Sequence, residues 1–251
     1  MTVSANSDSS VENSSALPEK SGLESEKHNT EQELHESPEA DGAEAETYSP
    51  EDMDGWIDIL GSKQLFRKIV REGCSDENDV RPSRGNAVEV RLKCWLQDQP
   101  EAVVDDQERL RFVLGQLDVI DGIELCTEMM KLSEVDLLRI PARFAYGSRG
   151  RSPDIPPDAS IECELELLSI EPGPDTASMA YDECLQYAQG RKHRGNYYFQ
   201  REEHSKAIAV YAMGVKALES YSGAAEATPE AKTVRSWQAL LHNNAAAAQL
   251  K

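Results

Sequence analysis

The stretch Tyr146–Pro157 holds the residues of this chain best suited to form a binding surface. Three prolines and two glycines surround one tyrosine and one isoleucine, Ile155. Each proline fixes its own φ and so restricts the backbone. The loop therefore either turns a corner or builds a surface, and we favour a surface in which Tyr146 and Ile155 overhang a cleft. The alternative is that Tyr146 and Gly147 only shape a turn.

A second group of polar residues lies near the C-terminus. Lys192 and Asn196 are four residues apart, so a helix places both on one face. Asn244 follows, seven residues before Lys251. The alternative is that Lys192 is a solvated surface lysine and that Asn196 is an ordinary polar residue of a helix surface.

The sequence gives little reason to expect a metal site. The acidic residues that could lie near a cation in a loop are Asp105, Asp106, Asp118 and Asp121. Their spacing matches no known calcium loop, and a solvated acidic face is the simpler interpretation. We expect neither a metal nor a cofactor.

The five cysteines are odd in number and scattered, with no Cys-x-x-Cys pair. This pattern is typical of reduced thiols in a cytosolic compartment. The cysteines are Cys74, Cys94, Cys126, Cys163 and Cys184.

Charge separates an N-terminal segment from the rest. The chain has 26 basic and 46 acidic residues, a net charge of −20, which argues against a nucleic-acid partner. Residues 1–54 hold fifteen acidic residues and two lysines. With so few apolar groups this segment is predicted to be a disordered acidic arm. Neither a secretory signal nor a long apolar run is present, so we expect no direct membrane insertion by this chain.

Residues 55–171 show the two-residue period of half-buried strands. The clearest alternation runs from Val88 to Leu96, from Leu110 to Leu114 and from Ile161 to Leu167, with weaker strand candidates at 63–70 and 135–140. Residues 122–130 are predicted to form one short helix. The fold class is therefore α+β, an antiparallel sheet wrapped on a short helix.

A Pro-Gly-Pro break at residues 172–174 ends the alternation, and residues 175–251 follow a helical period. Asp175 or Thr176 is the predicted cap of a first helix that runs to about Arg201. A second helix carries Ile208 to Leu218, and Pro229 begins a third. This second domain is predicted to be all-α.

Several motifs in residues 63–170 resemble the FKBP-type immunophilin family. They are Val119-Ile120, Phe144-Ala145-Tyr146-Gly147, Ile155-Pro156-Pro157 and the strand Glu164–Leu168. The resemblance implies peptidyl-prolyl cis-trans isomerase activity on a proline-containing client protein. Such a reaction twists an amide over a barrier of about 20 kcal/mol, so it needs an apolar pocket and a few hydrogen bonds rather than a catalytic triad.

The resemblance also implies the residues of the proline pocket. The catalytic groups are the Tyr146 hydroxyl and the backbone N–H of Ile120. The substrate-binding residues are Leu92, Leu110, Phe112, Val119, Ile123, Ile155 and Cys163. The family has aromatic rings at four of these positions, where this chain has Leu92, Leu110, Ile123 and Cys163. Because each ring buries a large apolar area, their loss predicts weak or latent activity.

Residues 175–251 resemble tetratricopeptide (TPR) repeats, with one repeat and the start of a second. Gly195, Tyr198, Ala207 and Tyr211 fit the repeat spacing, and Gly214 stands where alanine is usual. Chaperone-binding members capture the C-terminal carboxylates of a heat-shock protein of the Hsp90 type. The resemblance implies this partner for Lys192, Asn196 and Asn244. Because repeats need neighbours to bury a continuous core, the chain looks like a fragment or short isoform.

Within the FKBP family, subtype eight is the branch most similar to this chain in the order of its parts: an acidic arm, a divergent immunophilin domain and TPR repeats. The resemblance rests on Trp56–Gly61 and on Gly150-Arg151-Ser152-Pro153. It implies a cytoplasmic location for this chain, and the surface of mitochondria or endoplasmic reticulum for a longer form with a C-terminal anchor. Three functions stay open: an adaptor or co-chaperone with two binding modules, an active isomerase that assists folding, and an interaction protein that acts through the acidic arm.

Overall fold

The computed structural model describes residues 54–74, 80–219, 221 and 228–251. The predicted acidic arm, residues 1–54, lies outside these ranges except for Asp54, so its disorder stays a prediction. Within the described ranges, no helix combines the length and the apolar character needed to cross a bilayer.

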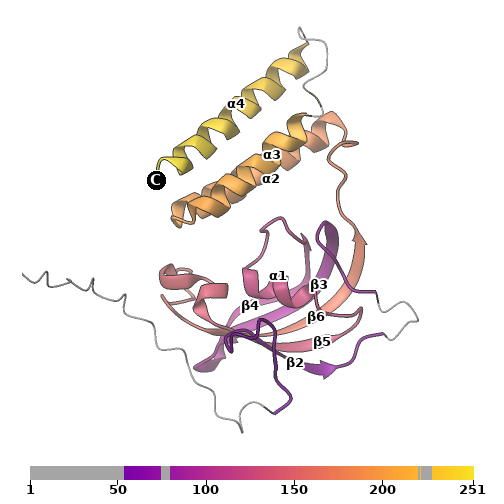
Figure 1. The fold of residues 1–251 in the computed structure, drawn as a ribbon, viewed down its shortest axis with the longest axis vertical. Helices are drawn as coiled ribbons and strands as arrows, with labels where there is room; N and C mark the ends of the chain where they lie inside the picture. Colours follow the sequence, from indigo (N-terminus) through magenta and orange to yellow (C-terminus); the bar gives the residue numbers. More distant parts are fainter. Residues whose placement is uncertain (1–53, 75–79, 220, 222–227) are drawn as a thin grey trace, which may run out of the picture. The chain divides into compact units, whose positions relative to one another are not determined.

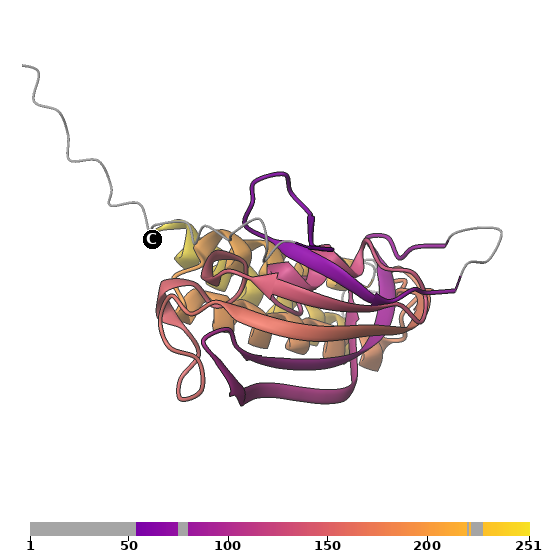
Figure 2. The same ribbon diagram turned by 90° about the horizontal axis from the view of Figure 1, so that it is seen from below.

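One antiparallel sheet of six strands forms the first part of the fold (Figure 1). Its spatial order is β1-β2-β5-β6-β3-β4, so strands distant in the chain pair at its centre. The strands are β1 (Ile57–Asp58), β2 (Phe66–Arg71), β3 (Asn86–Leu96), β4 (Gln99–Val113), β5 (Val135–Ile140) and β6 (Ile161–Pro172). Figure 2 shows how strongly the strands twist and curve.

The alternation of apolar and polar residues in the sequence arises because one face of the strand is buried, as β3 shows. In β3, Val88, Val90 and Leu92 are buried, whereas Arg91 and Lys93, on either side of Leu92, are exposed. The β4 strand begins at Gln99, well before Leu110, where the sequence predicted its start. The first half of β4 is largely exposed, so it has no buried face to produce an alternating pattern in the sequence. The predicted α+β class with an antiparallel sheet is confirmed.

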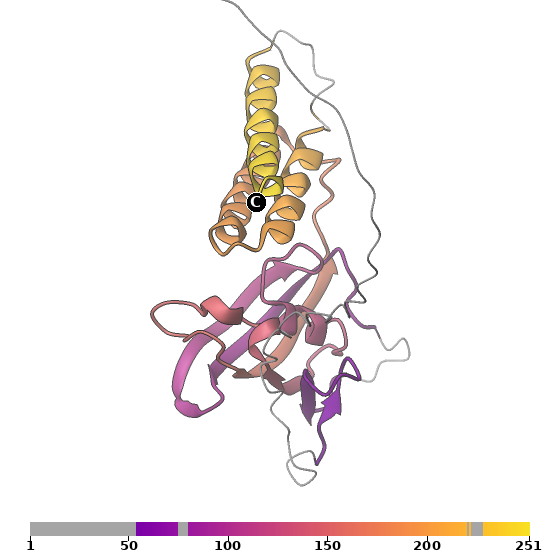
Figure 3. The same ribbon diagram turned by 60° about the vertical axis from the view of Figure 1, so that its left-hand side comes forward.

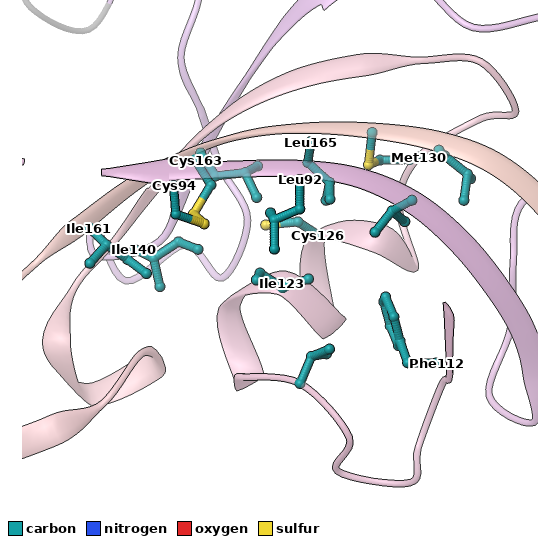
Figure 4. Packing of buried hydrophobic residues seen from close by; sticks show 14 of the residues in the cluster. Leu92, Cys94, Phe112, Ile123, Cys126, Met130, Ile140, Ile161, Cys163 and Leu165 are labelled. Atoms are coloured by element: carbon teal, nitrogen blue, oxygen red, sulfur yellow. A yellow bond between two sulfur atoms is a disulfide. The ribbon is translucent and has the colours of Figure 1, made fainter. Parts of the chain in front are cut away.

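The helix α1 (Asp121–Thr127) covers the inner face of the sheet. It begins one residue before the predicted segment and ends three residues earlier, where the Thr127 hydroxyl donates to the carbonyl of Ile123 (2.7 Å). Gly122 allows the helix to approach the sheet closely, because a Cβ there would lie 2.4 Å from Cγ2 of Ile140. Figure 4 shows Ile123 of this helix facing the buried side chains of the strands.

Three long helices form the second part of the fold: α2 (Tyr181–Gln200), α3 (His204–Glu219) and α4 (Pro229–Gln249). Helices that follow one another in the chain pack side by side and antiparallel, α2 against α3 and α3 against α4 (Figure 3). This confirms the predicted helical segment. As predicted, Pro229 opens α4, where the Thr228 hydroxyl caps the helix by accepting from the amide of Ala231 (3.1 Å).

The predicted cap of the first helix was wrong. The Asp175 carboxylate accepts from the amide of Ala177 (3.1 Å) and closes a separate turn. The helix α2 starts later, at Tyr181, where Glu183 reaches back to accept from the amide of Ala180 (3.0 Å). Two glycines let the helices touch: a Cβ at Gly195 would lie 2.3 Å from the Tyr211 ring, and one at Gly214 would lie 2.9 Å from Leu241. The second contact accounts for a glycine where the repeat usually has alanine.

Candidate functional site

The nine predicted pocket residues gather in one cluster on the inner face of the sheet. Six of them are buried members of the core and three are partly buried residues packed against it. The buried residues are Leu92, Phe112, Val119, Ile123, Ile155 and Cys163, and the partly buried ones are Leu110, Ile120 and Tyr146. The sequence thus identified residues that lie together, although they come from β3, β4, β6, α1 and two loops.

The floor of this cluster is closed. Ile123 is 4% exposed, Ile155 is 2% exposed and Cys163 is fully buried. Ile155 does not overhang a cleft as expected, because its amide and carbonyl both hydrogen bond with the backbone of Arg151 at 2.8 Å and its side chain turns inward. These residues act here as core, and the partly exposed Tyr146 and Ile120 are left at the surface.

A disulfide joins Cys94 and Cys163, so the expectation of five reduced thiols was wrong for this pair. The two residues lie opposite each other on β3 and β6, with 4.1 Å between their Cα atoms. Figure 4 shows the bond at the base of the cluster, near Leu92. Because the cysteines are 69 residues apart, only strand pairing brings them together and no spacing motif announces it. Cys74, Cys126 and Cys184 are free.

The Tyr146 hydroxyl is held by an arginine to which the sequence gave no role. Arg151 donates from Nη1 to the Tyr146 hydroxyl (2.9 Å) and to the carboxylate of Asp105 (2.7 Å), and from Nη2 to the carbonyl of Val104 (2.7 Å). Burial raises the pKa of Tyr146, while the Arg151 charge opposes the shift. The phenol therefore keeps its proton at neutral pH and can donate it in a hydrogen bond to a substrate carbonyl.

Ile120 supplies the other predicted hydrogen-bond donor. It precedes α1 with an extended backbone (φ −71°, ψ 151°). Among the described residues we find no acceptor for its N–H group. A substrate carbonyl is thus a suitable partner for this amide.

A cavity of about 390 Å³ opens beside Tyr146. Its lining is mostly charged and contains no aromatic ring other than that of Tyr146. The lining residues are Arg143, Ala145, Tyr146, Gly147, Ser148, Arg149, Arg201, Glu202, Glu203 and Lys206. This cavity therefore does not provide an apolar pocket for a proline ring.

Two of the three predicted partner-binding residues, Asn196 of α2 and Asn244 of α4, contact each other, and Lys192 lies one helical turn before Asn196 on α2. Asn244 donates from Nδ2 to Oδ1 of Asn196 (3.4 Å), which also accepts from the Tyr211 hydroxyl (2.7 Å). The ammonium of Lys192 lies 5.6 Å from the centre of the Trp237 ring. Since both bonds occupy its oxygen, the NH₂ group of Asn196 is the one available to a bound anion. Tyr211, which the sequence identified only through the repeat spacing, and Trp237 were not predicted to contribute to this group.

The four aspartates considered for a cation do not form a cluster. Asp105 pairs with Arg151, Asp118 with Arg191 (2.6 Å) and Asp121 with Lys206 (2.8 Å). The charges of these three aspartates are therefore balanced by protein cations. No group of three or more potential ligands is found within the described ranges.

Comparison with known proteins gives a direct match for the sheet domain. Residues 78–168 match the family model of the FKBP-type peptidyl-prolyl cis-trans isomerase. The chain is 29% identical over 191 residues to peptidyl-prolyl cis-trans isomerase FKBP4 of Bos taurus, covering 74% of this chain and 40% of that protein. It is 28% identical over 124 residues to FK506-binding protein 59 of Drosophila melanogaster, covering 48% of this chain and 28% of that protein.

Solved structures give a similar but partial match. The three FKBP domains of wheat FKBP73 align with 46% of this chain and 48% of that one, with 28% identity and a TM-score of 0.42. The chain spans only 40% of the length of the bovine relative. What the comparisons identify is an FKBP-type peptidyl-prolyl isomerase domain at residues 78–168, in a chain homologous to FKBP4 and FK506-binding protein 59.

Proposed function

We propose that this protein is an adaptor of the co-chaperone kind. Its FKBP-type domain holds a proline-containing client with weak or latent isomerase activity, and its helical segment binds the acidic C-terminus of a heat-shock chaperone of the Hsp90 type. The observation that carries the proposal is the contact of Asn196 on α2 with Asn244 on α4, with Lys192 one helical turn before Asn196 on the same face of α2. An ammonium beside two amides is a suitable receptor for a carboxylate.

The geometry of the proline site supports weak activity. The side chains at the base of the cluster are buried and two sulfurs are joined, so little apolar surface is left to strip water from a proline ring. The Tyr146 hydroxyl and the Ile120 amide still provide hydrogen bonds for a twisted carbonyl. Hydrogen bonds without an apolar floor favour binding of a carbonyl more than rotation of the amide.

An acidic peptide with a free C-terminal carboxylate tests the carboxylate-binding group. We expect measurable binding to the full chain, and a loss of about tenfold in affinity for Lys192→Ala, because a charged hydrogen bond contributes about 1.5 kcal/mol. The same peptide with an amidated C-terminus should bind as weakly to the wild type as the free peptide does to the variant. Lys232→Ala, on the exposed side of α4, is the control. Equal binding of both peptides would exclude carboxylate capture.

The competing function is an active isomerase, favoured by the surviving Tyr146 hydroxyl and Ile120 amide. A protease-coupled assay with a prolyl peptide separates the two. The adaptor proposal expects turnover far below that of an ordinary FKBP-type enzyme. Brisk turnover that Tyr146→Phe abolishes would instead establish the isomerase as the main activity. A role of the acidic arm, outside the described residues, is tested by deletion of residues 1–53, which should leave peptide binding and turnover unchanged.

A further inference from the structure

The helix α2 presents one continuous face of arginines and tyrosines to the FKBP-type domain. Five side chains follow one another at alternating intervals of four and three residues, which places them on one side of a helix. They are Tyr187, Arg191, Arg194, Tyr198 and Arg201. Each makes a hydrogen bond to the FKBP-type domain. Such a regular series is a docking surface rather than a set of separate surface contacts.

The first four side chains of this face hold the loop before α1. Arg194 donates from Nε to the carbonyl of Leu117 (2.6 Å) and from Nη2 to that of Val119 (3.5 Å). The Tyr198 hydroxyl donates to the same Leu117 carbonyl (3.0 Å) and accepts from Arg194 (2.9 Å). Val119 and Ile120 belong to the predicted proline site, so Arg194 holds the backbone on one side of it.

Arg201, the last of these five side chains, holds the loop that carries Tyr146. Arg201 donates from Nη1 to the carbonyl of Gly150 (2.7 Å) and from Nη2 to the carbonyl of Tyr146. Its remaining Nε donates to Glu203 (2.6 Å), which fixes the guanidinium in place. Arg201 is only 14% exposed in its side chain, so these bonds are shielded from water. One helix therefore grips both loops beside the proline site.

We infer that Arg194 and Arg201 are positioning residues of the proline site, through which the helical segment sets the arrangement of the Leu117–Ile120 and Tyr146–Gly150 loops. Their guanidinium groups bind the backbone carbonyls of Val119 and Tyr146, two residues of that predicted site, and those of Leu117 and Gly150 beside them. This inference rests on the proposed proline site, and its test has one readout that needs no activity.

Hydrogen exchange of the full chain provides that readout. In Arg201→Ala we expect exchange of the segment Tyr146–Gly150 to rise about tenfold while that of β3 stays as in the wild type, because about 1.5 kcal/mol of charged hydrogen bonding to that loop is lost. In Arg194→Ala the rise should be confined to the loop before α1. Lys232→Ala, which removes a charge from an exposed site on α4, should change neither loop. Arg194→Lys and Arg201→Lys, which keep one donor, should recover part of the protection and guard against loss of folding.

Peptide kinetics provide the second readout. For a prolyl peptide we expect KM to rise about fivefold in Arg201→Ala with kcat nearly unchanged, since the loops frame the site while the Tyr146 hydroxyl is retained. Unchanged exchange of both loops, or an equal rise in the loops and β3, would overturn the inference. Absence of turnover in the wild type together with local loop exchange would count against the isomerase function and leave the positioning role supported.

Discussion

Asn196 on α2 and Asn244 on α4 meet side chain to side chain, with 3.4 Å between Oδ1 of the first and Nδ2 of the second. They are 48 residues apart in the chain. The helix α3 also takes part in this contact, because its Tyr211 hydroxyl donates to the same oxygen of Asn196 (2.7 Å). Three helices thus fix the orientation of one amide, and that orientation decides which group a partner encounters.

A negative charge introduced at this amide should separate a binding role from a packing role. Asp at position 196 keeps an acceptor for the Tyr211 hydroxyl but places a negative charge where a peptide carboxylate would bind. We expect Asn196→Asp to reduce affinity for an acidic C-terminal peptide more than Asn196→Ala does, with a loss of ten- to a hundredfold, or about 1.4 to 3 kcal/mol. Calorimetric titration measures it. If the two variants bind alike, the amide does not face the peptide.

The contact between Gly195 and Tyr211 makes a second prediction. Gly195→Ala would place a Cβ 2.3 Å from the ring, so α2 and α3 must move apart. We expect the free energy of unfolding to fall by about 1 to 3 kcal/mol, the usual range for overpacking. Gly190→Ala on the same helix is the matched control, because nothing lies within 4 Å of its added Cβ. The control should gain up to about 1 kcal/mol from helix propensity. Denaturant unfolding of both variants measures the difference, and equal stabilities would contradict this close packing.

Stability should depend on the oxidation state of Cys94 and Cys163. A cross-link that closes a loop of this length is expected to contribute about 4 kcal/mol by restricting the unfolded chain. Unfolding in the presence of a phosphine reductant should therefore occur at a lower denaturant concentration than without it. In the double variant Cys94→Ala and Cys163→Ala the reductant should have no effect, whereas Cys74→Ala, which removes an exposed free thiol, should respond like the wild type. A wild type insensitive to reductant would contradict this contribution.

A buried ion cluster predicts an unusual dependence on pH. Arg67 contacts both Glu134 and Asp136 at 3.1 Å, and all three are almost completely buried. Burial raises the pKa of Asp136 to about 7, with the Arg67 charge opposing the shift and Glu134 adding to it. The unfolded value is roughly 3.9. Between these two values the folded chain binds more protons than the unfolded chain, so this group lowers the free energy of unfolding as the pH rises.

The contribution of Asp136 can be isolated with an uncharged variant. We expect the free energy of unfolding of the wild type to fall more steeply between about pH 5 and about pH 7 than that of Asp136→Asn, since the amide does not titrate. The exposed Asp98→Asn is the control and should follow the wild type. Parallel curves for the wild type and Asp136→Asn would show that Asp136 keeps an ordinary pKa.

The sequence by itself determined the elements and the grouping of the site. The alternation from Val88 to Leu96 and the helical period after the Pro-Gly-Pro break each reflect one buried face, and a buried face leaves its period in the sequence. The pocket residues could be named because the motif around Tyr146 and the Val119-Ile120 pair have the order and spacing of the FKBP type, which residues 78–168 match. The first half of β4 has no buried face, so its sequence does not alternate and the strand was not predicted there.

Only the tertiary structure decided what those residues do together. The Cys94–Cys163 disulfide depends on the register of β3 with β6, which local sequence does not encode. Arg151 and Arg201 bind carbonyl and carboxylate groups that other segments of the chain bring close to them. The sequence around an arginine does not predict which distant group it will bind. Periodicity shows which side of an element is buried, whereas strand register and helix docking set the contacts between distant residues that shape this site.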